Sequence, residues 1–167
     1  MRGVFQESLR WLPMLLWANG ISAQTCMVLS RPTIGTNGTA TFDLSLRSSP
    51  GDKPAALQWT FQYSRSDITA LAVDDGPALV AAGKSTFCAG NSDAFNCLAV
   101  GLNSRVIGDG IIGKVTATLA SGADSTSLLV KSSLAGSPEG YFISVIAKYG
   151  AAPYCQPPPH RGGAVGK

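Results

Sequence analysis

Residues 57–63 read Leu-Gln-Trp-Thr-Phe-Gln-Tyr, and every second side chain in this stretch is apolar or aromatic. Strict alternation with a period of two is typical of a β-strand that buries one of its faces. A second apolar run, residues 68–73, follows after a short polar break. The stretch therefore predicts a half-buried strand whose aromatic side chains enter a core and whose glutamines face solvent.

Similar short runs recur along the chain at intervals of about ten residues, a spacing that is typical of sandwiches and barrels. The breaks between them are rich in Gly, Pro, Asn and Asp, which favour turns. The predicted strands are residues 26–30, 39–47, 57–63, 68–73, 78–82, 86–89, 97–103, 111–119, 127–131 and 141–147. Because almost no segment has a helical period, the sequence predicts an all-β fold, an antiparallel sandwich of two sheets.

The two ends differ in composition from the middle. Residues 1–23 combine early arginines, an apolar run and a small residue at the end, which predicts a cleaved signal peptide. No later run has the roughly 20 apolar residues needed to span a bilayer. Residues 156–167 are Pro-rich and then Gly-rich, which predicts a flexible tail. We therefore expect one domain, residues 24–155, in a secreted protein that is extracellular or periplasmic.

Charge is low and dispersed over the chain. Only 14% of the residues are charged, and the formal net charge is +3. The basic residues stand singly and are not clustered beside aromatic residues, so nothing predicts a nucleic-acid partner.

The chain has four cysteines, an even number that suits an oxidising compartment. Three pairings are possible. The eight residues between Cys88 and Cys97 are rich in Gly, Asn, Ser and Asp, so we expect these two cysteines to close a local loop. Cys26 and Cys155 would then tie the ends of the domain together. There is no Cys-x-x-Cys motif, and the only histidine, His160, lies in the predicted tail, which argues against a metal site.

Several of these stretches, taken in order, resemble the cohesin-like modules of secreted bacterial proteins. The stretches are residues 57–73, Gly83-Lys84, residues 98–103 and residues 108–119, which begin with Gly-Asp-Gly. The resemblance extends over most of residues 26–147. It implies a nine-stranded jelly roll, shared in outline with several carbohydrate-binding modules, and a role in non-covalent attachment.

Cohesins bind partner proteins called dockerins on one sheet face. The resemblance implies that the matching face here is formed by outward residues of the runs 57–63 and 97–103. These residues are Gln58, Thr60, Gln62, Ala99, Gly101 and Asn103. The partner is then a protein, dockerin-like, or a polysaccharide.

The sequence contains only weak signals for a catalytic site. Residues 78–85 match a loose phosphate-loop pattern, but the following residues do not begin a helix, which that motif requires. The carboxylates lie mostly in turns, and Asp43 within the run 39–47 faces away from the apolar side chains. With one histidine in the tail, no nucleophile has a base beside it. We therefore expect no enzyme activity; a hydrolase that uses Asp43 is the weakest hypothesis.

No cofactor is expected. Residues 74–76 and 91–93 are oxygen-rich and suit calcium, but they lack the ligand spacing of a calcium-binding loop and favour plain turns. The alternative to a binding module is a structural or adhesive spacer of the cell envelope or matrix.

Overall fold

The computed structural model describes residues 25–49, 51–90, 94–123 and 127–150. The predicted signal peptide, residues 1–23, and the predicted tail, residues 156–167, lie outside this part. The elements in chain order are β1 (Thr25–Leu29), β2 (Thr33–Ile34), β3 (Thr39–Arg47), β4 (Ala56–Tyr63), β5 (Ile68–Asp75), α1 (Pro77–Ala82), β6 (Ser85–Gly90), β7 (Ala94–Val100), β8 (Gly110–Leu119), β9 (Leu128–Gly136) and β10 (Phe142–Tyr149).

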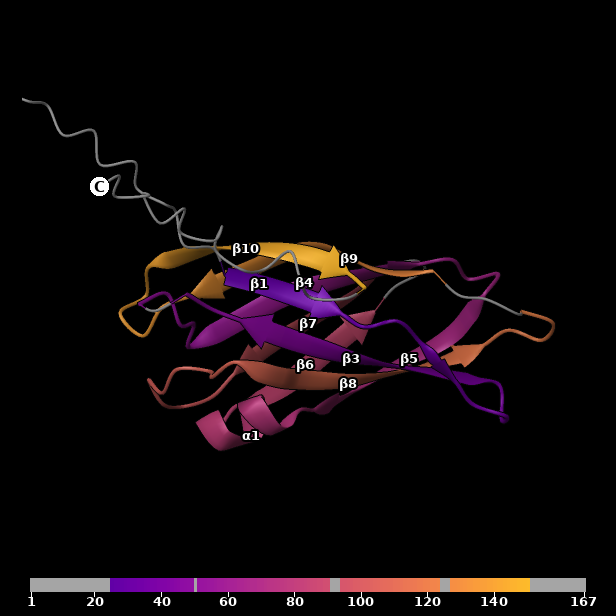
Figure 1. The fold of residues 1–167 in the computed structure, drawn as a ribbon, viewed down its shortest axis with the longest axis horizontal. Helices are drawn as coiled ribbons and strands as arrows, with labels where there is room; N and C mark the ends of the chain where they lie inside the picture. Colours follow the sequence, from indigo (N-terminus) through magenta and orange to yellow (C-terminus); the bar gives the residue numbers. More distant parts are fainter. Residues whose placement is uncertain (1–24, 50, 91–93, 124–126, 151–167) are drawn as a thin grey trace, which may run out of the picture.

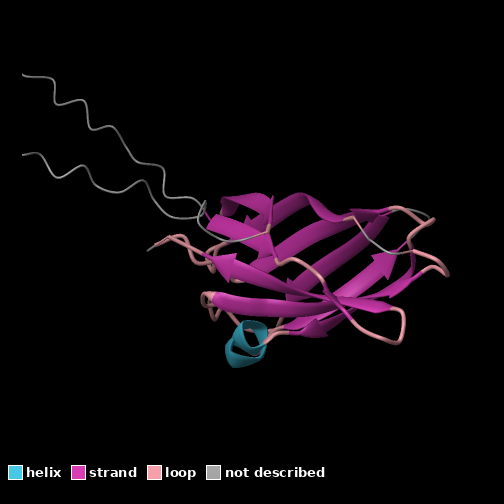
Figure 2. Ribbon diagram, turned by 45° about the vertical axis from the view of Figure 1, so that its right-hand side comes forward, coloured by secondary structure: helices cyan, strands magenta, loops and turns pink. Residues whose placement is uncertain are grey.

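Nine strands form one hydrogen-bonded path in the order β5-β8-β3-β1-β10-β9-β4-β7-β6, and β2 pairs with β3 beside it. The path folds over on itself, so that the strands lie in two layers (Figures 1 and 2). One layer contains β5, β8, β3 and β1, and the other contains β9, β4, β7 and β6. The pairing of β1 with β10 is parallel, whereas the other pairs on the path are antiparallel. The predicted all-β sandwich is confirmed.

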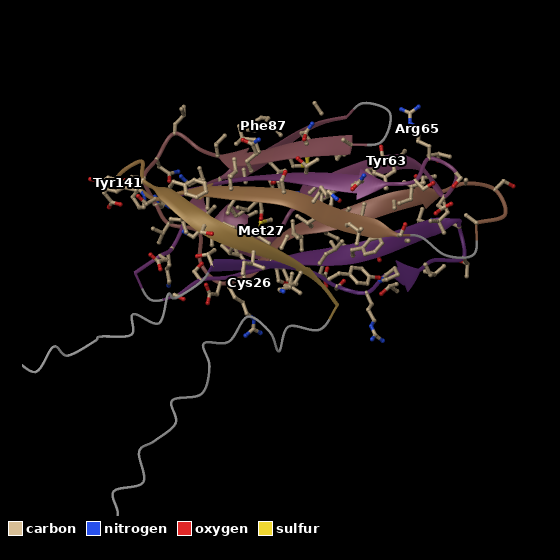
Figure 3. All side chains as sticks on the ribbon, turned by 90° about the horizontal axis from the view of Figure 1, so that it is seen from above. Cys26, Met27, Tyr63, Arg65, Phe87 and Tyr141 are labelled. Atoms are coloured by element: carbon tan, nitrogen blue, oxygen red, sulfur yellow. A yellow bond between two sulfur atoms is a disulfide. The ribbon has the colours of Figure 1, made fainter. Side chains whose placement is uncertain are left out.

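The core lies between the two layers and is filled by every second side chain of the strands. In β4 the buried residues are Leu57, Trp59 and Phe61, as the alternation predicts. The rings of Trp59 and Phe61 pack edge to face, with centroids 6.3 Å apart. Met27, at the centre of β1, belongs to the same core and is labelled in Figure 3. Other large buried side chains are Phe42, Leu29, Leu44, Leu46, Ile68, Leu79, Ile107 and Ile112.

The predicted strand 78–82 is wrong, because these residues form most of helix α1. Pro77 stands at the start of the helix, where its missing N–H costs nothing. Gly83 ends it with φ 63, and the N–H groups of Gly83 and Lys84 donate to the carbonyls of Val80 and Leu79. The helix packs on β8 and connects the two edge strands, β5 and β6. Within the described part of the chain, no helix is long and apolar enough to cross a membrane.

The seventh predicted strand is displaced. β7 begins at Ala94 and ends at Val100, instead of covering residues 97–103. Residues 101–109 form the connection to β8, where Ile107 is buried and its N–H donates to the carbonyl of Pro54 over 2.7 Å. The short β2, residues 33–34, is a strand that the sequence did not predict.

Gly76 provides a test of how closely α1 is packed on β8. It is buried, and a Cβ atom added there would lie 2.4 Å from the carbonyl oxygen of Ile111. Because that neighbour is backbone, Gly76→Ala must displace α1, and we expect a loss of about 1–3 kcal/mol in the free energy of unfolding. Chemical denaturation measures this loss in the free energy of unfolding. Gly136→Ala is the matched control, since nothing lies within 4 Å of its added Cβ; an equal loss in both variants would contradict this account.

Candidate functional site

The outer surface of the layer β9-β4-β7-β6 is the candidate site, and we call it the β4 face. The strand registers place the outward side chains of the four strands in rows across the sheet. The β4 face consists of Phe87 and Ala89 on β6, Asn96 and Leu98 on β7, Gln58, Thr60 and Gln62 on β4, and Leu129, Ser132 and Leu134 on β9.

One row of the β4 face is mainly apolar. Phe87 is opposite Leu98, Leu98 is opposite Gln58, and Gln58 is opposite Leu134. Phe87 is 63% exposed, and Leu98 and Leu134 are 41% and 46% exposed. Figure 3 shows Phe87 on one side of the molecule and Cys26 on the other. Large apolar side chains that gather on a surface mark a site of interaction more often than single ones do.

Three open hollows divide the β4 face. Leu98 and Gln58 line two of them, one of about 380 Å³ that reaches Phe87 and one of about 160 Å³ that reaches Leu134. Phe87 separates the first from a third hollow of about 340 Å³, lined also by Val100 and Leu102. Leu98 therefore forms a ridge at the middle of the face, with room for partner side chains on both sides.

The neighbouring row is polar. The Ser132 hydroxyl donates to Thr60 Oγ1 over 3.2 Å, and Thr60 Oγ1 donates to Asn96 Oδ1 over 2.7 Å. This chain of hydrogen bonds crosses three strands and fixes the three side chains. The amides of Gln58 and Gln62 are exposed, and no hydrogen bond to either is found among the described residues. They are therefore available to donate to and accept from a partner.

The β4 face carries little charge. Lys131, exposed at the bulge where β9 passes Thr60, is the single charged residue in β4, β6, β7 and β9. The opposite layer differs, because Asp43, Lys114 and Asp74 stand side by side across β3, β8 and β5. A surface with exposed leucines, an exposed aromatic ring and few charges has the composition of the central part of a protein interface.

Three of the six predicted face residues lie on the β4 face: Gln58, Thr60 and Gln62. Ala99 does not, because it is 0% exposed and lies opposite Leu57 in the core. Gly101 and Asn103 follow the end of β7 and are exposed in the connection to β8. The prediction of Ala99 as an outward residue is wrong because the inward and outward positions of β7 are the reverse of those expected, and the prediction of Gly101 and Asn103 as strand residues is wrong because β7 ends at Val100. On β7, the outward residues Asn96 and Leu98 are ones that the sequence does not predict.

Gly101 and Asn103 hold the end of α1 instead. Asn103 Nδ2 donates to the carbonyl of Gly83 over 3.0 Å, and Lys84 Nζ donates to the carbonyl of Asn103 over 2.6 Å. A Cβ atom on Gly101 would lie 2.5 Å from the Gly83 carbonyl oxygen. Lys84 is buried. The phosphate-loop pattern of residues 78–85 thus has a helix before Gly-Lys and a strand after it, the reverse of what a phosphate site requires.

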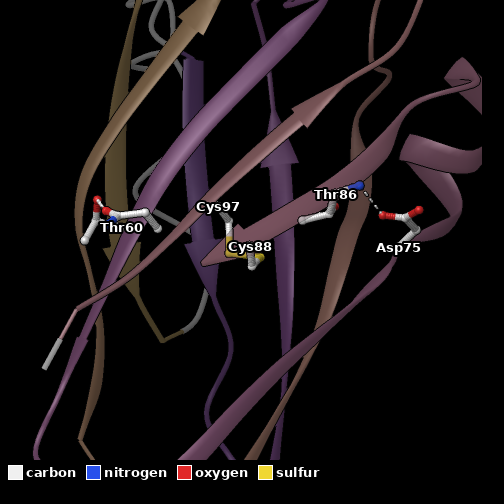
Figure 4. Close-up of a disulfide and its surroundings, with 6 residues drawn as sticks. Thr60, Asp75, Thr86, Cys88 and Cys97 are labelled. Atoms are coloured by element: carbon white, nitrogen blue, oxygen red, sulfur yellow. Dashed lines mark hydrogen bonds between the residues drawn. A yellow bond between two sulfur atoms is a disulfide. The ribbon is translucent and has the colours of Figure 1, made fainter. Parts of the chain in front are cut away.

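The predicted disulfide between Cys88 and Cys97 is confirmed (Figure 4). The two cysteines are directly opposite each other on β6 and β7, so the bond joins paired strands rather than closing a free loop. Nearby, the Thr86 N–H donates to Asp75 Oδ1 over 2.7 Å, which ties the edge strand β6 to the edge strand β5. Cys26 is disulfide-bonded. Cys155 lies outside the described residues, so its pairing with Cys26 stays a prediction.

The remaining sequence candidates are dispersed. Asp43 is exposed on the outer side of the layer opposite the β4 face, as predicted. Of the oxygen-rich loops, the first has Asp75 bonded to Thr86, and residues 91–93 lie outside the described part. No group of three or more His, Cys, Asp or Glu side chains among the described residues is placed to hold a metal ion.

Comparison with solved structures identifies the fold. A non-cellulosomal cohesin from the archaeon Archaeoglobus fulgidus matches with a TM-score of 0.60 and 12% identity, over 75% of this chain and 87% of that one. The sixth cohesin of scaffoldin B from Acetivibrio cellulolyticus, solved with a Cel5 dockerin, matches with a TM-score of 0.62 and 9% identity, over 77% and 99%.

A type I cohesin–dockerin complex from Clostridium thermocellum, Coh-OlpA-Doc918, gives a TM-score of 0.62 and 7% identity, over 75% of this chain and 99% of that one. No protein-family model and no curated protein matches the sequence. At these identities the similarity establishes the fold alone. The cohesin-like jelly roll that the sequence predicts is confirmed.

Proposed function

From the premise that this chain has the cohesin fold, we propose that it is a non-catalytic module that binds a protein partner on the β4 face. The observation that carries the proposal is the composition of that face, where Phe87, Leu98 and Leu134 are exposed beside the amides of Gln58 and Gln62, which have no hydrogen-bond partner within the described part of the chain. Apolar contacts supply affinity, and the amides select the partner by hydrogen bonding.

We propose a dockerin-like partner, since several solved relatives of the fold are complexes with dockerins. We propose also that the chain is secreted after removal of residues 1–23, which the disulfide of Cys88 and Cys97 supports because such bonds persist in oxidising compartments. Mass measurement of the exported protein, with Gln24 as its first residue, tests this second point.

The binding proposal is tested by calorimetric titration of the chain with dockerin modules and with soluble polysaccharides. We expect saturable binding to at least one dockerin. The double variant Gln58→Lys, Gln62→Lys should weaken that binding at least tenfold, because two ammonium groups must be desolvated at the interface. Equal affinity of the variant and the unmodified chain would remove the β4 face from consideration.

The same titration separates the alternatives. Binding to a polysaccharide and to no dockerin would replace the protein partner with a glycan. Binding to neither, by a chain with an intact fold, would contradict the proposal and favour a spacer role.

A further inference from the structure

The edge strand β6 contributes little to the core. It ends the path of strands, so only β7 pairs with it along its length. The residues of β6 that face the core are Thr86, Cys88 and Gly90, which lie opposite inward residues of β7. No residue of β6 is buried, whereas β4 buries two aromatic rings and a leucine. Burial of apolar surface therefore does little to hold β6 in place.

Two side-chain bonds fix β6, one in each half of the strand. Near its start, the Thr86 N–H donates to Asp75 Oδ1 over 2.7 Å (Figure 4). After Thr86, the disulfide between Cys88 and Cys97 is the single side-chain bond from β6 to the rest of the described chain. Without it, only backbone pairing with β7 would hold the second half of β6. A strand that is paired on one side and buries little apolar surface opens locally at a low free-energy cost.

The disulfide also lies within the β4 face. Phe87 and Ala89, the two residues that β6 supplies to this face, are the neighbours of Cys88 in the chain. Phe87 is 63% exposed, the most exposed of the large apolar side chains on the face. Cys88 and Cys97 line the hollow of about 380 Å³ that Phe87 borders. The position of Phe87 therefore depends on the bond beside it.

We propose that the disulfide of Cys88 and Cys97 controls the β4 face. In the reduced chain the second half of β6 separates from β7 and Phe87 leaves the face, whereas β4, β7 and β9 keep their places. Oxidation returns β6 to β7 and completes the face. A chain that is oxidised only after export thus binds its partner only there. This control of binding rests on the proposed function, whereas the opening of β6 does not.

The redox step is an exchange between a dithiol and a disulfide. Cys88 is the more accessible of the two cysteines, since Cys97 is only 1% exposed. The Cys88 thiolate attacks one sulfur of a carrier protein's disulfide, and the carrier's S–S bond breaks. The Cys97 thiolate then attacks Cys88 Sγ, and the mixed disulfide breaks. The carrier leaves as a dithiol that has taken up two electrons and two protons, and a small dithiol reverses the exchange in vitro.

The first test is amide hydrogen exchange of the unmodified chain, oxidised and then reduced with a small dithiol, with no partner present. The Thr86 N–H points to Asp75 and away from β7, so the N–H groups of Phe87 and Ala89 point toward β7. We expect these two amides to exchange at least tenfold faster after reduction. Unchanged exchange at both would overturn the proposal.

The amides of Trp59 and Phe61 in β4 are the internal control. β4 is paired on both sides and buried, so we expect their exchange to change much less than that of β6. Equal acceleration in both strands would show that reduction opens the whole domain, and it would overturn the proposal.

A variant separates this disulfide from the bond of Cys26, which the dithiol also reduces. The double variant Cys88→Ala, Cys97→Ala keeps the bond of Cys26, and its β6 amides should exchange as fast as those of the reduced chain. Slow exchange in the variant, with fast exchange in the reduced chain, would assign the effect to Cys26 and overturn the proposal. Thermal unfolding checks that the variant is folded; if it is not, the reduced chain decides.

The second test measures the control of binding by calorimetric titration with a dockerin module that the oxidised chain binds. We expect the reduced chain to bind at least tenfold more weakly and reoxidation to restore the affinity. In Phe87→Ala, reduction should cost less affinity, because the side chain that β6 withdraws is already absent. Equal affinity of the oxidised and reduced chains would overturn the control of binding. If the oxidised chain binds no dockerin, the proposed function fails, and hydrogen exchange still decides whether β6 opens.

Discussion

Leu98→Asp is expected to weaken binding of the proposed protein partner at least 100-fold while leaving the domain folded. Leu98 stands between two hollows of the β4 face and is 41% exposed, so a partner that covers the face must bury it. The substitution removes an apolar contact at the centre of the interface and puts an unpaired carboxylate in its place. Substitutions at such central positions commonly cost about 2 kcal/mol or more of binding free energy. A 100-fold change in the dissociation constant corresponds to about 2.7 kcal/mol. Calorimetry measures the dissociation constant.

Two variants separate the causes of this loss. Thr118→Asp puts the same charge on an exposed strand residue of the opposite layer, and it should leave the affinity unchanged. Leu98→Ala removes the contact without adding charge, and its loss should be smaller than that of Leu98→Asp. Thermal unfolding checks that all three variants are folded. A Leu98→Asp variant that binds as tightly as the unmodified chain would show that the partner docks elsewhere.

Trp59→Ala is expected to lower the free energy of unfolding by about 3–5 kcal/mol, the largest stability change that we predict for a single substitution. Trp59 is fully buried at the centre of β4, and it packs edge to face on Phe61. Removing the indole leaves a cavity that the surrounding strands cannot fill. Denaturation in urea measures the loss. A change below about 1 kcal/mol would mean that the two layers collapse onto the vacant space.

Trp59→Phe is the informative companion. The indole Nε1 is buried, and it has no hydrogen-bond partner within the described part of the structure. An unpaired buried donor costs about 1–3 kcal/mol. Phenylalanine removes that donor while it keeps most of the apolar ring, so the loss in the free energy of unfolding should be within about 1 kcal/mol. A loss as large as that of Trp59→Ala would contradict this account and indicate that the size of the indole dominates.

The sequence predicts which side of a strand faces the core wherever the other side of that strand is polar. In β3 and β4 the alternation is regular, and both strands begin and end within one residue of their predicted bounds. Each alternating residue independently favours the same face, so local pattern and tertiary packing agree. For the same reason Gln58, Thr60 and Gln62 could be placed on the outer side before the structure was known.

The errors occur where the pattern is ambiguous. In β7 nearly every residue is apolar or small, so the sequence does not distinguish Leu98 as outward from Ala99 as inward. The disulfide could have done so, since Cys97 must face the same side as Cys88 and lies 1% exposed against the core. Seven of the ten residues of the β4 face are not predicted from the sequence, and the apolar ones among them, including Phe87 and Leu134, are of types that are typical of buried positions.

Helix α1 was missed for a different reason. Its six residues are too few to show a helical period, and Leu79-Val80 is compatible with a strand. The decisive signals are local: Pro77 at the first position and Gly83 in the left-handed conformation at the end. Both signals also occur in turns between strands, so the sequence alone does not decide between the two.

The parallel pairing of β1 with β10 has a mechanical consequence. Thr25 begins β1 at one end of this pair, and Tyr149 ends β10 at the other. A tension that pulls these two residues apart along the strands loads all five register pairs together, in shear, instead of opening them one after another. Under a load in this geometry, the rate of forced unfolding is set by the rate at which the whole strand pair slips. The place where the two layers join is thus also the place that would bear a load applied along these two strands.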